Sequence, residues 1–246
     1  MELIKRIKSM LCSSNREAHS DENIKLHGRM ANRDRYNDVK CFINNSNPII
    51  IDGGAHKGSV VKMFLQQYKS PIIYAFEPIP ECVDVLMSTF ADLSNVHVIQ
   101  RALGAQKKTV KFNVVNNLVS SSILNPSEIK IKYHGKKVAI SESIEVEMIR
   151  LDSELGFLNE IDILKLDLQG FELEALKGAK RLLHKTKIII TEIEFVKLYD
   201  DQALFGDIDV YLRANGFKLL NLYDLYTQPD GQLTAGDAVY LNEKWF

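Results

Sequence analysis

The chain has 246 residues, of which 46% are hydrophobic, and its 31 basic and 32 acidic side chains give a formal net charge of −1. A chain of this length buries roughly 70–75% of its unfolded surface, so neither disulfides nor a metal ion is needed for folding. The balanced charge argues against a nucleic-acid partner, because such binding rests on an excess of Lys and Arg. We therefore expect one globular domain of the α/β class.

The beginning of the chain is not typical of a secreted or membrane-spanning protein. Basic residues interrupt residues 1–11 where a signal peptide would be apolar, and no apolar run approaches the ~20 residues of a transmembrane helix. The three cysteines lack CxxC spacing, which is typical of a reducing compartment. These features predict a cytoplasmic protein. Weak peripheral membrane contact through residues 1–11 stays open, because their apolar positions fall at helical spacing, and no feature indicates the oligomeric state.

Residues 1–47 are polar and predict a helical or weakly ordered N-terminal cap, whereas residues 48–246 have the texture of a single folded domain. Apolar runs predict strands over 48–52, 71–76 and 96–100, and helical spacing predicts helices over 60–68 and 80–90. This β-α-β-α-β order is typical of a parallel sheet covered by helices.

Residues 105–150 break this rhythm and predict a β-rich insertion or edge segment. Alternating apolar and polar residues over 109–115 and 143–149 predict strands with one wet face, and the Ser/Asn-rich stretch 116–125 predicts a loop between them.

The remainder of the chain returns to buried strands and helices. We expect strands over 161–167 and 187–193, and helices over 172–184 and 207–215. The last two strands, 217–223 and 237–241, flank a Pro-Asp-Gly turn and are joined too closely for a helical crossover, so they must be antiparallel. A mostly parallel seven-stranded sheet with a C-terminal antiparallel hairpin and helices on both faces resembles the Rossmann-like fold of class I methyltransferases.

A glycine-rich turn follows the first predicted strand. It contains Asp52, Gly53, Gly54, Ala55 and Gly58, and its glycine spacing does not fit the GxGxxG pattern of dinucleotide-binding proteins. A carboxylate at Asp52 would repel a pyrophosphate but accept a cation, which favours S-adenosylmethionine, a ligand with an ammonium, a sulfonium and no phosphate. The alternative is a tight turn that needs glycine only for its backbone angles.

A second acid closes the next strand in the sequence Phe76-Glu77-Pro78. An acid about twenty residues past the glycine turn is placed to accept the hydroxyls of an adenosine ribose, and Pro78 favours an extended backbone at Glu77. The alternative is a solvated glutamate at the end of a strand.

Several ordered motifs resemble the FkbM family of S-adenosylmethionine-dependent methyltransferases. Residues 165–179 contain that family's K-x-D-x-E/Q-G-x-E run and the following L-x-G-A, while D-x-G-A-x-x-G, F-E-P and A-L-G precede it at 52–58, 76–78 and 102–104. The resemblance covers residues 48–241 and implies O-methylation of a hydroxyl on a sugar, glycan or other secondary metabolite. It implies cofactor contacts from the turn, from Glu77 and Pro78, and from Ala102. Gln169 stands where glutamate is commoner in the family.

Two further acids end the predicted fourth and fifth main strands, Asp167 and Glu192. We expect Asp167 to accept the proton of the acceptor hydroxyl or to orient it, with Glu192 assisting. The same pair could hold Mg²⁺, although our expectation is that no metal is bound. Lys165 lies on the same face of its strand as Asp167, so it either pairs with one of these acids or contacts the substrate.

Other readings stay open from the sequence. His56, in the glycine turn, and His134, in the insertion, are alternative bases, and Ser120, Ser121 and Ser122 could supply hydroxyl contacts. A catalytically silent adenosyl-binding scaffold is the rival from another class, and a nicotinamide-dependent oxidoreductase is the rival enzyme.

Overall fold

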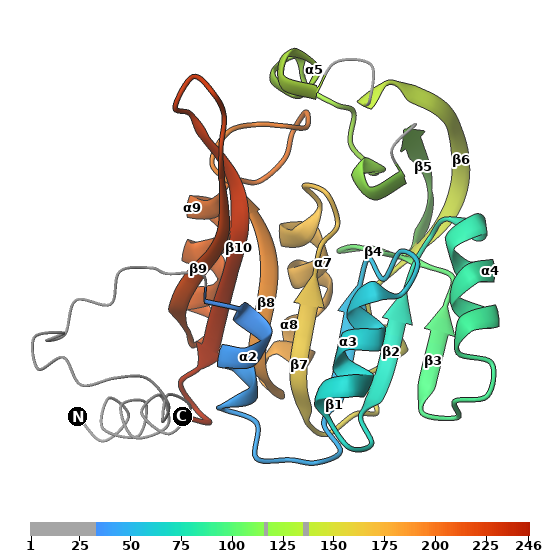
Figure 1. The fold of residues 1–246 in the computed structure, drawn as a ribbon, viewed down its shortest axis with the longest axis vertical. Helices are drawn as coiled ribbons and strands as arrows, with labels where there is room; N and C mark the ends of the chain where they lie inside the picture. Colours follow the sequence, from blue (N-terminus) through green and yellow to red (C-terminus); the bar gives the residue numbers. More distant parts are fainter. Residues whose placement is uncertain (1–32, 116–117, 135–137) are drawn as a thin grey trace, which may run out of the picture.

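The computed structural model describes residues 33–115, 118–134 and 138–246 (Figure 1). Its strands are β1 (Ile49–Gly53), β2 (Ile72–Phe76), β3 (Val96–Ile99), β4 (Ala102–Leu103), β5 (Lys108–Val115), β6 (Ile140–Ile149), β7 (Ile161–Leu166), β8 (Thr186–Glu194), β9 (Phe217–Thr227) and β10 (Leu233–Asn242). Its helices are α2 (Arg35–Lys40), α3 (Ser59–Gln67), α4 (Pro80–Thr89), the 3₁₀ turn η1 (Leu118–Ser120), α5 (Glu128–His134), α6 (Leu151–Glu154), α7 (Glu172–Gly178), α8 (Lys180–Leu183) and α9 (Phe205–Ala214).

The main sheet has seven strands in the order β3-β2-β1-β7-β8-β10-β9. All neighbouring pairs from β3 to β8 are parallel, while β10 pairs antiparallel with both β8 and β9. The predicted mixed α/β, Rossmann-like sheet with a C-terminal antiparallel hairpin is therefore confirmed. Strands β1 and β7 are neighbours at the centre of the sheet. Their carboxyl ends therefore bring the glycine-rich turn at 52–58 close to the family motif at 165–179.

Helices cover both faces of this sheet (Figure 1). One apolar cluster joins the sheet to α2, α3 and α4 through Val39, Phe64 and Leu86. The other joins it to α6, α7, α8 and α9, with Leu176 and Leu212 among its fully buried members. Since both faces are covered, β7 is buried at every position from Ile161 to Leu166.

The insertion forms a separate sheet of three strands in the order β4-β6-β5. Its apolar face packs with α4, since Phe112, Val146 and Met148 share a cluster with Ile79 and Cys82. Figure 1 shows this sheet and α5 standing at the end of the main sheet to which the strands β1, β2 and β7 point. The insertion is thus placed beside the edge where parallel α/β sheets bind ligands.

Two local features differ from the sequence expectation. The helix predicted over 172–184 is divided into α7 and α8 at Ala179, whose N–H bonds to the Leu176 carbonyl in a tighter turn. A Cβ at Gly178 would overlap the carbonyl oxygen of Gly104, so this helix packs unusually close to the chain after β4. Helix α5 was not foreseen within the insertion.

The structure describes the N-terminal cap only from residue 33, and within it α2 spans Arg35–Lys40. The weak membrane contact that the sequence leaves open for residues 1–11 lies outside the described residues. Within the described part of the chain, the helices are too short or too polar to cross a membrane.

Candidate active site

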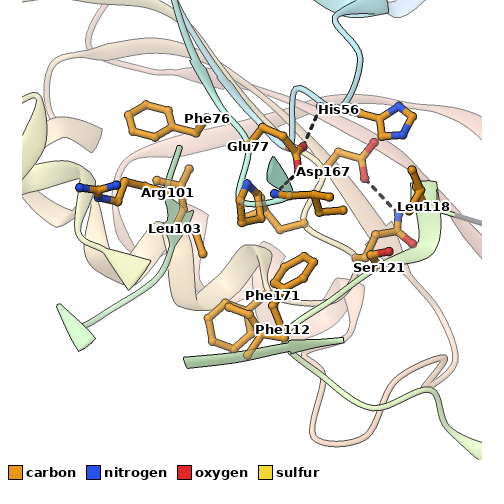
Figure 2. A pocket seen from close by; sticks show the side chains of 17 residues that line it. His56, Phe76, Glu77, Arg101, Leu103, Phe112, Leu118, Ser121, Asp167 and Phe171 are labelled. Atoms are coloured by element: carbon orange, nitrogen blue, oxygen red, sulfur yellow. Dashed lines mark hydrogen bonds between the residues drawn. The ribbon is translucent and has the colours of Figure 1, made fainter. Parts of the chain in front are cut away.

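A pocket opens at the carboxyl edge of the main sheet, between the glycine turn and the insertion (Figure 2). Strand β2 delivers Glu77 to this pocket, and β7 delivers Asp167. The lining residues are Gly54, His56, Phe76, Glu77, Pro78, Ile79, Arg101, Ala102, Leu103, Phe112, Leu118, Ser121, Ile123, Asp167, Leu168, Gln169 and Phe171. The candidates Gly54, Glu77, Pro78, Ala102 and Asp167 therefore face one cavity, and Gly53, Ala55 and Gly58 build the turn beside it.

The glycine turn needs glycine both because neighbouring backbone lies very close to it and because its backbone angles are left-handed. Gly54 has φ +76°, and a Cβ on it would overlap the carbonyl oxygen of Asp167. The N–H groups of Gly54 and Ala55 both donate to the carbonyl of Phe76 at 3.0 Å, which ties the turn to the end of β2. Gly58 has φ +85° and precedes α3. The turn thus holds β1, β2 and β7 together at the pocket floor.

Asp52 lies beneath the turn and does not line the pocket. Its side chain is fully buried, and its Oδ1 lies 2.9 Å from the ammonium nitrogen of Lys165. The same nitrogen donates to the carbonyls of Gly53 at 3.2 Å and Gly54 at 3.0 Å, whereas Asp167 is 4.0 Å away. The ammonium thus donates hydrogen bonds to two carbonyls of the turn and forms an ion pair with Asp52. Lys165 therefore pairs chiefly with Asp52 and supports the turn from below.

Glu77 is held by backbone donors on both carboxyl oxygens. Its Oε1 accepts from the N–H of Ile79 at 2.9 Å, and its Oε2 accepts from the N–H of His56 at 2.8 Å. Burial raises the pKa of Glu77 to about 7, against the opposing effect of these two N–H groups. Each oxygen keeps a further lone pair, so a rigid, buried carboxylate can accept two more hydrogen bonds from a diol in the pocket.

The wall of the pocket away from His56 is apolar. Figure 2 shows Phe112 and Phe171 side by side there, and the pocket lining also includes Leu103, Leu118 and Ile123. Phe112, Leu118 and Ile123 come from the insertion, so that segment closes the same pocket that Glu77 enters. An apolar wall next to a buried carboxylate with free lone pairs has the chemical features needed for an adenosine, and Gly54 presents only backbone to the pocket.

Gln169 links the two acids expected to work on the acceptor. Its amide nitrogen donates to Asp167 Oδ1 at 3.0 Å and to Glu192 Oε2 at 2.8 Å. Gln169 itself adopts φ +54°, next to Gly170 at φ +94°, so the loop after β7 is strained in the way that functional loops often are. The Asp167 side chain is 40% exposed, while burial and the neighbouring Asp167 and Glu194 carboxylates raise the pKa of Glu192 well above its usual range. Asp167 is therefore the more accessible proton acceptor of the pair.

Some of the histidine and serine candidates line the pocket, and the others lie outside its lining. His56 lines the pocket near Asp167, and burial lowers its pKa (Figure 2). His134 ends α5, and the described pocket lining does not include it. Ser121 lines the pocket, Ser122 donates to the carbonyl of Gln169 at 2.8 Å, and the Ser120 carbonyl meets the hydroxyl of Tyr199. Glu172, part of the family motif, accepts from the N–H of Leu168 at 2.5 Å and closes the strained loop.

Sequence reasoning missed two residues that contact Gln169. Lys130 and Tyr199 both lie near the amide oxygen of Gln169, at 3.5 Å and 2.7 Å. No local pattern singled them out, because Lys130 lies among alternating Ile and Lys residues in an insertion and Tyr199 precedes two aspartates in a loop. Among the described residues, no group of three or more His, Cys, Asp or Glu side chains has the geometry of a metal site.

Comparison with known proteins agrees with this arrangement. The model of the methyltransferase FkbM domain matches residues 52–219. The chain is 34% identical over 198 residues to methyltransferase sdnD of Sordaria araneosa, covering 71% of this chain and 75% of that protein. It is 29% identical over 217 residues to the 2-O-methyltransferase NoeI of Sinorhizobium fredii (strain NBRC 101917 / NGR234), covering 84% of each.

The fold is also similar to a solved structure. The crystal structure of methyltransferase FkbM from Methylobacillus flagellatus KT superimposes with a TM-score of 0.53 at 17% identity, covering 80% of this chain. This chain spans 44% of the length of that structure. From the family match over most of the chain, we conclude that the protein belongs to the FkbM family of S-adenosylmethionine-dependent methyltransferases.

Proposed function

We propose that this methyltransferase transfers the methyl group of S-adenosylmethionine to a hydroxyl of a small molecule or glycan. The observation that carries the proposal is the shared pocket, which is lined by both the buried Glu77 carboxylate and the more exposed Asp167 carboxylate. A diol-binding acid and a proton acceptor at neighbouring strand ends suit an adenosyl donor with a hydroxyl acceptor. The relative named as a 2-O-methyltransferase supports oxygen as the methylated atom.

Each candidate residue has a distinct part in this proposal. Glu77 accepts hydrogen bonds from the ribose hydroxyls, Pro78 and Ala102 border the adenosine, and Gly53, Gly54, Ala55 and Gly58 bring the backbone close to the methionine portion. S-adenosylmethionine, when bound, supplies a methyl group already activated by the positive sulfur. The acceptor oxygen bonds to that methyl carbon as the carbon–sulfur bond breaks, and Asp167 accepts the hydroxyl proton, leaving S-adenosylhomocysteine and a methyl ether.

Glu192 and Lys165 act less directly. Glu192 is the partner of Asp167 through Gln169, and its raised pKa makes it a poorer proton acceptor at neutral pH. Lys165 is proposed to hold Asp52 and the turn in place, because its buried ammonium pairs with Asp52 and donates to the carbonyls of Gly53 and Gly54.

Calorimetric titration with S-adenosylhomocysteine tests the cofactor assignment. We expect the wild-type chain to bind, and we expect Glu77→Ala to weaken binding by at least roughly tenfold because a buried carboxylate acceptor is lost. The matched control is Glu81→Ala, in the first turn of α4, whose side chain is 69% exposed. Absence of binding by the folded wild-type chain at millimolar ligand contradicts the proposal and favours a scaffold with another ligand. Binding of a nicotinamide dinucleotide in its place favours an oxidoreductase.

Methyl transfer and its acceptor class require a separate assay. Candidate sugars, glycans and hydroxylated metabolites are incubated with S-adenosylmethionine carrying a deuterated methyl group, and products are screened by mass. We expect a product heavier by one labelled methyl group, on an oxygen atom. A folded chain that binds S-adenosylhomocysteine yet labels carbon or nitrogen contradicts the O-methylation part alone.

A further inference from the structure

Helix α5 buries a charged side chain and exposes apolar ones. Lys130 is 3% exposed, although Ile129 and Ile131 on either side of it are 39% and 53% exposed. Burying a lysine costs free energy unless its ammonium has partners, and exposing two isoleucines forgoes hydrophobic stabilisation. The interior contacts of Lys130 must therefore account for this orientation.

Those contacts lie at the Gln169 network. The ammonium nitrogen of Lys130 is 3.5 Å from the centre of the Tyr199 ring and 3.5 Å from the amide oxygen of Gln169. The charges of four acids act on this ammonium and favour its charged form: Glu192 and Glu194 of β8, Glu172 of α7, and Asp167 after β7. Lys130 is thus the cation set among the acids of the proposed acceptor side.

The position of Lys130 determines which way the Gln169 amide points. Its oxygen faces the Lys130 ammonium, which can only donate, and the Tyr199 hydroxyl, whose single hydrogen also faces the Ser120 carbonyl, whereas its nitrogen faces two acceptors, Asp167 and Glu192. Reversing the amide would place its N–H₂ group against the Lys130 ammonium, so that two donors would meet, and its oxygen against the Asp167 carboxylate. The orientation that serves both acids is therefore held by donors supplied from outside the main sheet.

We propose that Lys130 is a positioning residue of the acceptor site, which fixes the Gln169 amide so that it donates to Asp167 and Glu192. This inference rests on the proposed function for its role in methyl transfer. It gives the insertion a second role besides closing the cofactor pocket: α5 must lie against the loop after β8 that carries Tyr199 if the acid pair is to be correctly oriented. A glutamine at position 169 suits this arrangement, because a glutamate there would place a third acid between Asp167 and Glu192.

The titration of Lys130 offers a direct test. Burial lowers the pKa of Lys130 to about 8, while Glu192, Glu194, Glu172 and Asp167 act in the opposite direction. The ammonium is therefore present below about pH 8 and is lost above it. Because the Gln169 amide oxygen accepts from that ammonium, the side-chain amide signals of Gln169 should respond to the same proton.

The experiment records side-chain amide ¹H–¹⁵N spectra of the full chain between pH 6.5 and 9.5, with and without S-adenosylhomocysteine. The Gln169 signals are assigned by their absence in Gln169→Ala. We expect their shifts to follow one titration with a midpoint near pH 8. That transition should disappear in Lys130→Met and in Lys130→Arg, and the arginine variant should keep the low-pH peak positions because it keeps the charge. Lys132→Met is the control, since Lys132 lies on the same helix with its side chain 68% exposed.

The outcomes are distinct. A Gln169 titration that persists in Lys130→Met, or Gln169 signals that are the same in the wild-type chain, Lys130→Met and Lys130→Arg, overturns the proposal. If the methionine variant fails to fold, the arginine variant decides. With the acceptor found by the mass screen, Lys130→Met should lower kcat roughly 10- to 100-fold at unchanged affinity for S-adenosylhomocysteine; unchanged kcat also overturns it. Failure of the wild-type chain to bind S-adenosylhomocysteine refutes the proposed function alone, because the titration can be read on the free chain.

Discussion

The Lys165 ammonium lies 2.9 Å from Asp52 Oδ1, and the two residues are register partners on the adjacent parallel strands β1 and β7. Both side chains are buried, at 6% and 0% exposure, directly below the glycine turn. The charge at the end of β1 is thus neutralised within the protein by a residue of the family motif. The pair supports the site from beneath, and the pocket itself receives Glu77 and Asp167.

Removing one charge of this pair should destabilise the fold strongly. Lys165→Met leaves Asp52 buried without its cation, and we expect a loss of about 3–5 kcal/mol in the free energy of unfolding, measured by urea denaturation. The double variant Asp52→Asn/Lys165→Met should recover part of that loss, because no lone charge stays buried. Lys177→Met, which breaks an exposed pair with Glu174, is the control and should change stability by less than about 1 kcal/mol. Equal small effects from both single variants would show that the buried pair is not structural.

Cofactor affinity should depend on the protonation of Glu77. Because burial raises its pKa to about 7, the neutral acid is populated below that pH and can no longer accept with both oxygens. We expect affinity for S-adenosylhomocysteine to be constant above about pH 8 and to weaken by up to about tenfold per pH unit below about pH 6. Titration calorimetry from pH 5.5 to 8.5 measures this, and Glu77→Gln should bind weakly with a flat profile. A wild-type affinity that does not vary over this range argues against Glu77 as a ligand.

Asp167→Asn should separate binding from turnover. The side chain is 40% exposed, so replacing its charge leaves the fold and the cofactor pocket largely intact. Loss of the proton acceptor should lower turnover by about 10²–10⁴-fold, while affinity for S-adenosylhomocysteine changes by less than about threefold. Parallel loss of binding and turnover refutes the role assigned to Asp167.

Glu192→Gln should be more stable than the wild-type chain at high pH but not at low pH. The folded-state pKa of Glu192 is raised by burial and by Asp167 and Glu194, so its favourable contribution is present at low pH and is lost as the pH rises through the folded-state pKa. The amide keeps an oxygen to accept from Gln169 without the charge. We expect a gain of about 1 kcal/mol at pH 8 and little difference near pH 4, measured by denaturant unfolding. A difference that is the same at both pH values shows that the charge of Glu192 is not the cause.

Gly54→Ala should abolish cofactor binding. The added Cβ would overlap the carbonyl oxygen of Asp167, and φ +76° is unfavourable for alanine. Thermal unfolding and calorimetry with S-adenosylhomocysteine measure the effect. Gly206→Ala is the control, because a Cβ there meets nothing within 4 Å and alanine favours helix α9. Normal binding by a folded Gly54→Ala chain would mean that close approach at this turn is unimportant.

Metal removal should leave methyl transfer unchanged. Asp167 and Glu192 were the candidate Mg²⁺ ligands, yet both already accept from the Gln169 amide nitrogen, a donor that would compete with a cation. We expect activity in the presence of EDTA to equal that of the untreated enzyme. Loss of activity that is restored by added Mg²⁺ would contradict this.

The sequence by itself determined the main sheet and the acids at its edge. Strands buried on both faces leave continuous apolar runs, and the motif acids Asp52, Glu77 and Asp167 fall where each run ends, so local pattern is enough to place them at one edge. The crowded glycine turn could be identified for the same reason, since its signal lies within seven consecutive residues.

Only the tertiary structure decided which of these groups meet. The partner of Lys165 depends on the register between β1 and β7, and this selects Asp52 at 2.9 Å over Asp167 at 4.0 Å. Lys130 reaches Gln169 across 39 residues of sequence, from a helix whose isoleucines face outward against its hydropathy. No local pattern encodes such contacts, because the free energy of burying a charge depends on partners that folding brings in from other elements.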